Sequence, residues 1–402
     1  MTSQNRRPTM KDNQAKYPQL RFKGYSDAWV QRKLGENATI LTGGTPKTTE
    51  PSYWEPKEIP WMSSGEVNKK RLESTDNMIS EIGLENSSAR WVKEHSILIA
   101  LAGQGKTRGM VAINNIPLTT NQSIAAIEPN ESLDYEFVFQ NLGNRYDELR
   151  MSSSGDGTRG GLNKKIISDI LVSAPDIDEQ KQIGKLFASL DNLIAANQRK
   201  LDLLKEQKKG YLQKLFPKNG SKFPQLRFAG FADAWEERKL GDITKISTGK
   251  LDANAMVENG KYDFYTSGIK KYRIDVAAFE GPSITIAGNG ATVGYMHLAD
   301  NKFNAYQRTY VLQEFLVDRS FIFSEIGNKL PKKIKQEART GNIPYIVMDM
   351  LTELKLSIPQ NNSEQQKIGS FFKQLDDTID LHQRKLEKLQ ELKKGYLQKM
   401  FC

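Results

Sequence analysis

The residues of this 402-residue chain that could do chemistry begin with Gly105-Lys106-Thr107, which matches the end of a phosphate-binding loop. The full Gly-x4-Gly-Lys-Thr motif needs a glycine where the sequence has Ala100. A second copy of the segment, AGNGATVG at 287–294, has Ala291 at the lysine position. The glycines therefore favour a turn with positive φ angles over a nucleotide site, and the turn would project the side chains of Gln104, Lys106 and Arg108.

A second candidate centre is acidic and lies at the start of a predicted helix. Asp176 and Glu179, followed by Lys181, superficially match the metal-binding carboxylates and lysine of a nuclease. The repeated segment has glutamine after Pro359 and again at the lysine position. We therefore expect helix starts here, with Asp178 and Ser363 as N-caps and acidic first turns that the helix dipole favours.

No other residue pattern indicates catalysis. The histidines, His95, His297 and His382, stand apart without a second ligand at metal-binding spacing, and Cys402 is the one cysteine. Neither the Asn-Pro-Pro-aromatic or Asp-Pro-Pro-aromatic tetrapeptide of amino-methyltransferases nor a strand-linked GxGxxG is present. The sequence predicts a binding scaffold with no catalytic residue, metal or cofactor of its own.

The elements that would position these side chains are duplicated. Residues 17–36 and 223–242, here called the opening segments, agree at 13 of 20 positions with an offset of 206. Residues 179–216 and 364–401 agree at 22 of 38 positions with an offset of 185, and both end in KKGYLQK. Because the bodies between these copies differ, we expect the repeats to set the geometry and the bodies to carry the function.

The two long repeats predict helices with a heptad seam. In each copy apolar residues recur at alternating steps of four and three, from Ile183 and from Ile368 onward, which favours two helices packed on each other. Only 217–242 separates the first helix from the second body, so antiparallel packing is expected, with the bodies at opposite ends about a pseudo-twofold axis. Asn197 and His382 would then meet near the axis and set the register, or be solvated at a loose point of the coil.

The predicted fold class is α/β (α+β, irregular), with two recognition domains on a long antiparallel two-helix coiled coil. Short β-branched runs such as ILIAL at 97–101 and SITIA at 283–287 indicate strands that enter tight turns. The expected parts are a flexible tail (1–16), a first domain (17–178), a central helix (179–216), a linker with a second domain (217–363) and a C-terminal helix (364–402).

Composition bounds the location and the partner. With 38% hydrophobic and 26% charged residues and no long apolar run, the chain is expected to be soluble, cytoplasmic and without membrane association. The net charge of +10 suggests a polyanionic partner. The first body, 37–178, has 14 basic and 19 acidic residues, however, and the second, 243–363, has 15 and 12. Any nucleic-acid contact would therefore be made by local loops.

Several segments together resemble the DNA specificity subunit of type I restriction-modification systems. They are the duplicated PQLRF…DAW…RKLG opening, GGTPK…PSYW…IPWMSSGEV at 43–67, ALAGQGKTRG at 100–109, NQSIAAI at 121–127 and the helices with EQ…QRKL…KKGYLQK. The resemblance covers nearly everything after residue 16. It implies two target recognition domains that each bind half of a bipartite double-stranded DNA site, and helices that set the spacer between the halves.

The same resemblance implies the partners. Two modification subunits would methylate adenine with S-adenosylmethionine, and two restriction subunits would translocate and cleave DNA with ATP and Mg²⁺, so this chain would be a non-catalytic DNA-recognition subunit. Two other classes stay open. A self-sufficient methyltransferase is disfavoured by the missing tetrapeptide, and a coiled-coil DNA-binding or scaffolding protein acting outside restriction-modification would need no modification subunit.

Side chains that donate hydrogen bonds on exposed turns are the candidate DNA contacts, because Arg and Lys suit guanine or phosphate and Asn and Gln suit adenine. Those in the first body are Gln104, Lys106, Arg108, Arg159 and Lys164. Those in the second are Asn289, Thr292, Arg308, Lys333 and Arg339. The cluster around Lys333 equally fits an ordinary solvated helix face.

Substituting Arg108 or Arg159 by alanine should relax recognition of one half-site and leave the other unchanged, because both residues belong to the first body. Sequencing the methylated positions in DNA modified by the reconstituted complex measures the effect. An equal loss at both halves would contradict the assignment.

Overall fold

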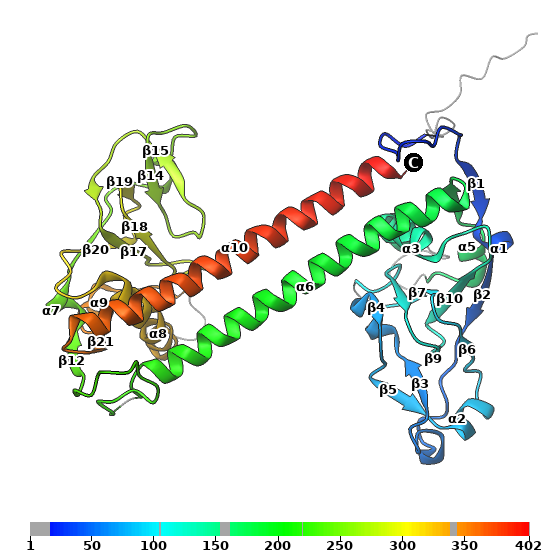
Figure 1. Cartoon of the computed structure of the whole chain (residues 1–402), viewed down its shortest axis with the longest axis horizontal. Helices are drawn as coiled ribbons and strands as arrows, with labels where there is room; N and C mark the ends of the chain where they lie inside the picture. The colour runs from blue at the N-terminus through cyan, green and yellow to red at the C-terminus, as the bar shows by residue number, and fades with distance from the viewer. Residues whose placement is uncertain (1–16, 104–105, 153–160, 219, 338–343, 402) are drawn as a thin grey trace, which may run out of the picture. The chain divides into compact units, whose positions relative to one another are not determined.

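The computed structural model describes residues 17–103, 106–152, 161–218, 220–337 and 344–401. The chain forms two compact units, one of Met1–Ala196 with Leu386–Cys402 and one of Asn197–Lys385. We call them unit 1 and unit 2. Both mix helices and strands (Figure 1). Each unit therefore contains one variable body and a part of both long helices. The predicted tail, 1–16, lies outside the described residues.

The two predicted long helices are α6 (Ile177–Leu215) and α10 (Asn362–Met400), of 39 residues each. Their N-caps are not those predicted. Asp176 Oδ1 accepts the backbone N–H groups of Asp178 and Glu179, both at 2.9 Å, and Asn361 Oδ1 accepts that of Ser363 at 2.9 Å. Asp178 and Ser363 lie inside the first turn, because Asp and Asn two residues earlier satisfy the free N–H groups.

Unit 1 has a five-stranded sheet (β2-β10-β7-β8-β4), a four-stranded sheet (β5-β3-β9-β6) and a two-stranded ribbon (β1-β11). Its strands are β1 (Val30–Lys33), β2 (Ala38–Thr42), β3 (Ile59–Met62), β4 (Arg71–Leu72), β5 (Asn77–Ile79), β6 (Trp91–Val92), β7 (Ile97–Ala100), β8 (Val111–Asn114), β9 (Leu118–Thr120), β10 (Ile124–Pro129) and β11 (Leu171–Ala174). Its short helices are α1 (Leu34–Asn37), η1 (Pro51–Tyr53), η2 (Ser64–Lys69), α2 (Glu81–Glu85), α3 (Tyr135–Asn144), α4 (Tyr146–Met151) and α5 (Lys164–Ser168).

Unit 2 repeats the plan with two four-stranded sheets (β13-β20-β17-β18 and β15-β14-β19-β16) and a ribbon (β12-β21). Its strands are β12 (Glu236–Lys239), β13 (Lys245–Thr248), β14 (Tyr262–Tyr265), β15 (Tyr272–Ile274), β16 (Phe279–Glu280), β17 (Ser283–Ala287), β18 (Met296–Ala299), β19 (Lys302–Ala305), β20 (Thr309–Gln313) and β21 (Lys355–Ile358). Its helices are α7 (Leu240–Ile243), η3 (Ala253–Ala255), α8 (Arg319–Glu337) and α9 (Met348–Thr352).

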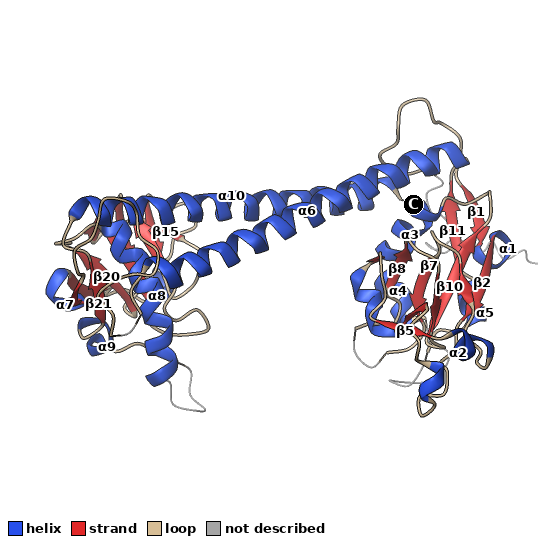
Figure 2. Cartoon of the chain, turned by 60° about the horizontal axis from the view of Figure 1, so that its bottom comes forward, coloured by secondary structure: helices blue, strands red, loops and turns tan. Residues whose placement is uncertain are grey.

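The strands predicted from β-branched runs, β7 and β17, are central and fully buried. Burial on both faces explains why they read as continuous apolar runs and not as an alternation. Helix α3 packs on β7 and β8 (Figure 2), and α8 packs on β17 and β18. The same helix-on-sheet layer therefore forms the body of each unit.

Each unit's core receives an aromatic ring from the end of a long helix. In unit 1, Phe401 lies 5.2 Å from Phe137, 5.7 Å from Phe187 and 6.4 Å from Trp29, measured between ring centroids. In unit 2, the corresponding ring is Phe216, which lies 5.5 to 6.0 Å from the rings of Phe321, Phe372 and Trp235. The core of each unit thus contains the start of one long helix and the end of the other.

The opening segments hold these helix ends. The Arg21 guanidinium donates two hydrogen bonds to Glu179 in the first turn of α6, both at 2.8 Å. The neighbouring Leu20 N–H donates to the Lys399 carbonyl near the end of α10 at 2.8 Å. Unit 2 has the same contacts at the same distances, from Arg227 to Glu364 and from Leu226 to Lys214. The opening segments are therefore duplicated because each copy joins the start of one long helix to the end of the other, with charge-assisted hydrogen bonds at the helix start.

The long helices run antiparallel inside each unit. In unit 1, Phe187 contacts Phe401 and Asp191 pairs with Lys393. Residues further along α6 thus contact residues nearer the start of α10. In unit 2, Tyr211 meets Phe371 and Lys208 meets Asp376. Most predicted seam residues are buried or half-buried, whereas four leucines outside the seam are exposed. The exposed leucines are Leu193, Leu203, Leu381 and Leu392.

The predicted register pair lies in unit 2. Asn197 is buried at 7% exposure, and Nδ1 of His382 is buried without a hydrogen-bond partner among the residues described. Their contact across the helix pair stays a prediction. Among the described residues, no helix is long and apolar enough to cross a membrane.

One buried acid distinguishes unit 2 from unit 1. Glu325 on α8 is fully buried, and burial raises the pKa of its carboxyl to about 7, although Lys329, the Ser357 N–H and Asn328 oppose the rise. Helices α3 and α8 align through their N-caps, Asp134 and Asp318, which places neutral Asn141 at the position of Glu325.

We expect Glu325→Gln to raise the free energy of unfolding at about pH 8.5 and to change it little at about pH 5. Because the folded-state pKa lies above the ordinary 4.5, stability falls as pH rises from 4.5 to about 7, and the loss is complete above that value. The gain should be at most about 3 kcal/mol. Urea unfolding at both pH values measures it, with exposed Glu280→Gln as the control. An effect independent of pH would contradict the prediction.

Candidate nucleic-acid interface

Five chain segments of unit 1 converge at the carboxyl ends of its parallel strands β3 and β9. Backbone hydrogen bonds join them: Asn121 N–H to the Met62 carbonyl at 3.0 Å, Leu101 N–H to that of Ser123 at 2.8 Å, and Leu162 N–H to that of Leu101 at 2.9 Å. We call this edge rim 1; it comprises residues 43–45, 62–65, 101–103 with 106–109, 121–123 and 161–163. The glycine turn and the segment before Lys164, predicted separately, are thus brought together.

Unit 2 forms an equivalent edge beside its parallel strands β14 and β19. The Tyr306 N–H donates to the Tyr265 carbonyl at 2.9 Å, the Gly288 N–H to that of Arg308 at 2.9 Å, and the Ile346 N–H to that of Gly288 at 2.7 Å. This edge is rim 2, comprising residues 248–251, 265–268, 288–292, 306–308 and 345–346. The two rims share a backbone framework and differ in side chains.

The glycine turns of the two rims differ in length. Backbone hydrogen bonds close the first turn between Ala100 and Met110 and the second between Ala287 and Tyr295. Residues 101–109 therefore correspond to 288–294, so the first turn is two residues longer. The constant offset of 185 between AGQGKTRG and AGNGATVG holds only near the C-terminal ends of the two segments. Gly109 and Gly294, with φ of 80° and 82°, occupy the same place in both turns and justify the predicted positive φ.

The described candidates of the first body lie at or beside rim 1. Lys106 is exposed on the turn, where the Tyr146 hydroxyl donates to its carbonyl at 2.5 Å, and Arg108 is half-buried on the same turn. Lys164 is exposed at the start of α5, directly after the rim. Gln104 and Arg159 lie outside the described residues.

In the second body, three of the candidates lie in rim 2. Arg308 is exposed and lines a cavity of about 340 Å³ together with Gln307. Asn289 Oδ1 accepts the Ser267 hydroxyl at 2.5 Å, and the Thr292 hydroxyl donates to the Ser267 carbonyl. Asn289 and Thr292 therefore use polar atoms to hold the rim together.

The remaining candidates of the second body do not join rim 2. Lys333 lies on α8, pairs with Glu337 at 2.5 Å and lines a different cavity, of about 930 Å³, with Lys329 and Lys332. This arrangement fits the solvated-face reading of the lysine cluster. Arg339 lies outside the described residues.

The connections that follow β3 and β14 carry basic residues that the predicted set omitted. In unit 1 the connection 63–76 contains SSGEVNKKR, and in unit 2 the connection 266–271 lies within TSGIKKYR. The shared Ser-Gly and Lys-Lys pairs are a signal visible in the sequence. The different spacing between them hides it from an alignment at constant offset.

The unit 1 connection is fixed by ion pairs. Glu66 accepts the backbone N–H groups of Ser63 and Asp76, both at 2.8 Å, and pairs with Lys69 at 2.9 Å. Within the connection, Arg71 on β4 donates to both oxygens of Glu136 on α3. The loop is therefore anchored at both ends.

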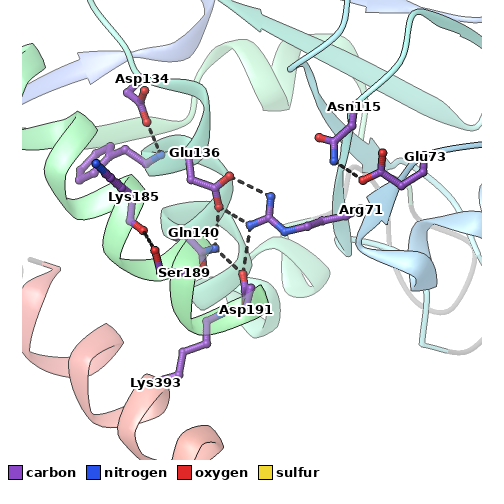
Figure 3. Close-up of polar contacts among 11 residues, drawn as sticks. Arg71, Glu73, Asn115, Asp134, Glu136, Gln140, Lys185, Ser189, Asp191 and Lys393 are labelled. Atoms are coloured by element: carbon purple, nitrogen blue, oxygen red, sulfur yellow. Dashed lines mark hydrogen bonds and ion pairs between the residues drawn. The ribbon is translucent and has the colours of Figure 1, made fainter. Parts of the chain in front are cut away.

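Arg71 also reaches the helix pair of unit 1 (Figure 3). It lies 3.2 Å from Asp191 on α6, which accepts Gln140 at 2.8 Å and pairs with Lys393 on α10 at 2.5 Å. Burial alone would raise the pKa of the Asp191 carboxyl, but Lys393, Gln140 and Arg71 together lower it. The carboxylate is thus a junction between the connection, α3 and both long helices.

In the described part of unit 2 the helix-pair contact occurs without an arginine. Lys208 and Asp376, at the offset of 185 from Lys393 and Asp191, pair at 2.5 Å. Burial raises the pKa of the Asp376 carboxyl despite Lys208, and the nearby Asp377 and Asp380 contribute in the same direction. The surroundings therefore favour the charged form of Asp191 in unit 1 and disfavour the charged form of its equivalent, Asp376, in unit 2.

We expect Asp191→Asn to lower the free energy of unfolding at pH 7 by about 1–3 kcal/mol, because Arg71 and Lys393 lose a charged acceptor. A carboxyl whose pKa is lowered on folding stabilises the protein above its unfolded pKa, so the full effect is present at neutral pH. The matched variant Asp376→Asn should leave stability unchanged or raise it. Urea unfolding of both variants tests the contrast, and equal losses would contradict it.

Comparison with known proteins places this framework in a family. The sequence profile described as type I restriction modification DNA specificity domain matches residues 26–206 and 232–391. The EcoDI specificity subunit of a type I restriction enzyme from Escherichia coli is 34% identical over 164 residues, which are 41% of this chain and 36% of the relative. The MjaIX specificity subunit from Methanocaldococcus jannaschii is 22% identical over 409 residues, covering 92% of each chain.

The fold also has a solved counterpart. The crystal structure of a type I restriction-modification system S subunit from M. genitalium superposes with a TM-score of 0.73 at 16% identity and covers 96% of this chain and 99% of that chain. At this identity the likeness shows the fold alone. Because the family profile matches both copies of the repeat, this chain belongs to the DNA specificity family of type I restriction-modification systems, as a specificity subunit.

Proposed function

We propose that each unit reads one half of a bipartite double-stranded DNA target, with rim 1 on one half-site and rim 2 on the other. The observation that carries the proposal is the duplication of one backbone framework with different side chains on its edge. Rim 1 offers Lys106 and Arg108, while rim 2 offers Gln307 and Arg308. Side chains of these types suit base edges and phosphates, and their difference favours an asymmetric target.

The long helices set the distance between the half-sites in this proposal. We infer that α6 and α10 form one antiparallel coiled coil with the recognition domains at its opposite ends. The antiparallel contacts inside each unit and the continuity of both helices through 39 residues support the inference. A helix of that length spans roughly 58 Å at 1.5 Å per residue. Binding of the second half-site then becomes intramolecular, which adds affinity only when the spacing matches.

Catalysis belongs to partner subunits in this proposal. The chain would act as a non-catalytic subunit that docks two modification subunits, which use S-adenosylmethionine, and two restriction subunits, which use ATP and Mg²⁺. Leucines exposed outside the helix seam, with 44 to 59% of their surface accessible, offer apolar area for such contacts. They are Leu193, Leu203, Leu381 and Leu392.

Inserting one heptad at the middle of both α6 and α10 tests the spacing role. Equal insertions keep the antiparallel seam in register and lengthen the pair by roughly 10 Å. We expect the methylated motif of the complex with its modification subunits to gain about three base pairs of spacer, at 3.4 Å per pair, with both half-sites unchanged.

Sequencing methylated positions in the modified DNA measures the motif. A variant with the heptad in α6 only is the control, because it disrupts the seam. An unchanged spacer with the paired insertion would contradict the ruler role, and a motif without two halves would contradict the proposed function.

A further inference from the structure

The loop between β14 and β15, residues 266–271, begins within rim 2 and is bound there to the glycine turn by side chains. The Thr292 hydroxyl donates to the Ser267 carbonyl, and the Ser267 hydroxyl donates to Asn289 Oδ1 at 2.5 Å. His297 has a hydrogen bond with the Gly268 backbone, and its ring lies 5.1 Å from that of Tyr265. These contacts hold the base of the loop against the glycine turn.

The tip of the loop presents two cations and one apolar side chain to solvent. Ile269 is 57% exposed, and Lys270 and Lys271 are both exposed. Among the described residues, the ion pair of this hairpin joins Arg273 to Asp263 at 2.5 Å and involves neither lysine. Their ammonium groups lie 5.5 Å from the Tyr272 ring and 5.4 Å from the Tyr265 ring. The aromatic faces restrict the lysines without neutralising their charge.

The counterpart in unit 1 is different. There Lys69 is bound by Glu66 and Asp76, and Arg71 is bound by Glu136 and Asp191. Those cations fix the fold of the connection. In unit 2 the connection is held by Ser267 and Gly268 instead, which leaves its lysines for an external anion.

We propose that loop 266–271 contacts the DNA of the second half-site, an inference that rests on the proposed function. Lys270 and Lys271 donate hydrogen bonds to guanine edges and phosphate oxygens, and Ile269 makes an apolar contact in the groove. Asn289 and Thr292 act as positioning residues that hold the loop, and Arg308 adds a further cation on the same rim. Rim 2 therefore reads DNA mainly through a loop whose lysines are not among the DNA contacts predicted from the sequence.

The test uses a double variant that carries both Lys270→Ala and Lys271→Ala. It is compared with the unchanged chain, and each is assembled with its modification subunits. We expect the affinity for duplex DNA that carries the target to fall at least about tenfold at constant salt. Lost base contacts will broaden the methylated motif in the second half-site only. Lost phosphate contacts will lower the slope of log affinity against log salt by about 0.9 for each contact.

The control is the double variant Lys261→Ala with Lys302→Ala. These lysines are exposed; Lys261 directly precedes β14 and Lys302 begins β19, at the ends of these strands opposite rim 2. The net charge therefore changes equally but away from rim 2. A loss of affinity shared by both double variants would overturn the proposal, as would an unchanged motif and affinity in the loop variant or a broadened first half-site. If the unchanged complex methylated no bipartite motif, the proposed function itself would fail, which is a distinguishable result.

The variant Thr292→Val tests the positioning role. It removes the hydroxyl that binds the Ser267 carbonyl and keeps both lysines. We expect a broadened second half-site with an unchanged salt slope, because the charges remain while the loop loses its fixed position. An unchanged motif would overturn the positioning role of Thr292.

Discussion

The structure depends on one constraint: each unit closes its core with the end of a helix that starts in the other unit. Phe401 completes the aromatic cluster of unit 1, and Phe216 completes that of unit 2. Burying a phenylalanine side chain stabilises a core by about 1.5–3 kcal/mol. The opening segments add a directed contact, since Arg21 and Arg227 bind the first turn of one long helix beside the last turn of the other. Each body is therefore stable only where two antiparallel helix ends meet, and this requirement is what the repeated sequence encodes.

The repeat leaves room for a difference in how firmly each body is attached. Unit 1 connects its rim to the helix pair through Arg71, whereas among the described residues of unit 2 the Lys208–Asp376 pair stands alone at that point. The same contrast appears in the connections themselves, where Lys69 and Arg71 of unit 1 pair with carboxylates, whereas Lys270 and Lys271 of unit 2 are exposed. The same place in the fold is thus occupied by a long connection with internal ion pairs in unit 1 and by a short connection with exposed lysines in unit 2. They make the two rims chemically unlike while the helices remain alike.

The helices could be predicted from the sequence because their period and duplication are local signals. The N-caps were misplaced by two residues because Asp176 and Asn361 suit the capping position as well as Asp178 and Ser363 do, and only the backbone geometry decides between them. The rims were predicted only in part. The Leu162–Leu101 hydrogen bond joins residues far apart in the chain, and no local sequence pattern predicts it. Asn289 and Thr292 were selected for their hydrogen-bonding capacity, which the structure shows to be partly used within the protein.

The way the rims are held together explains how recognition can vary on a constant fold. Most rim contacts are backbone hydrogen bonds, which do not depend on the side chains that project from the same residues. Lys106 and Arg308 stand on such segments, so changing them alters what the edge can bind and leaves its framework intact. Side chains also join segments in both rims: the Thr45 hydroxyl donates to Gln122 in rim 1. In rim 2 Ser267, Asn289 and Thr292 hold the loop to the glycine turn. In the proposed function, specificity in unit 2 is therefore divided between residues that hold the loop and residues on the loop that can change.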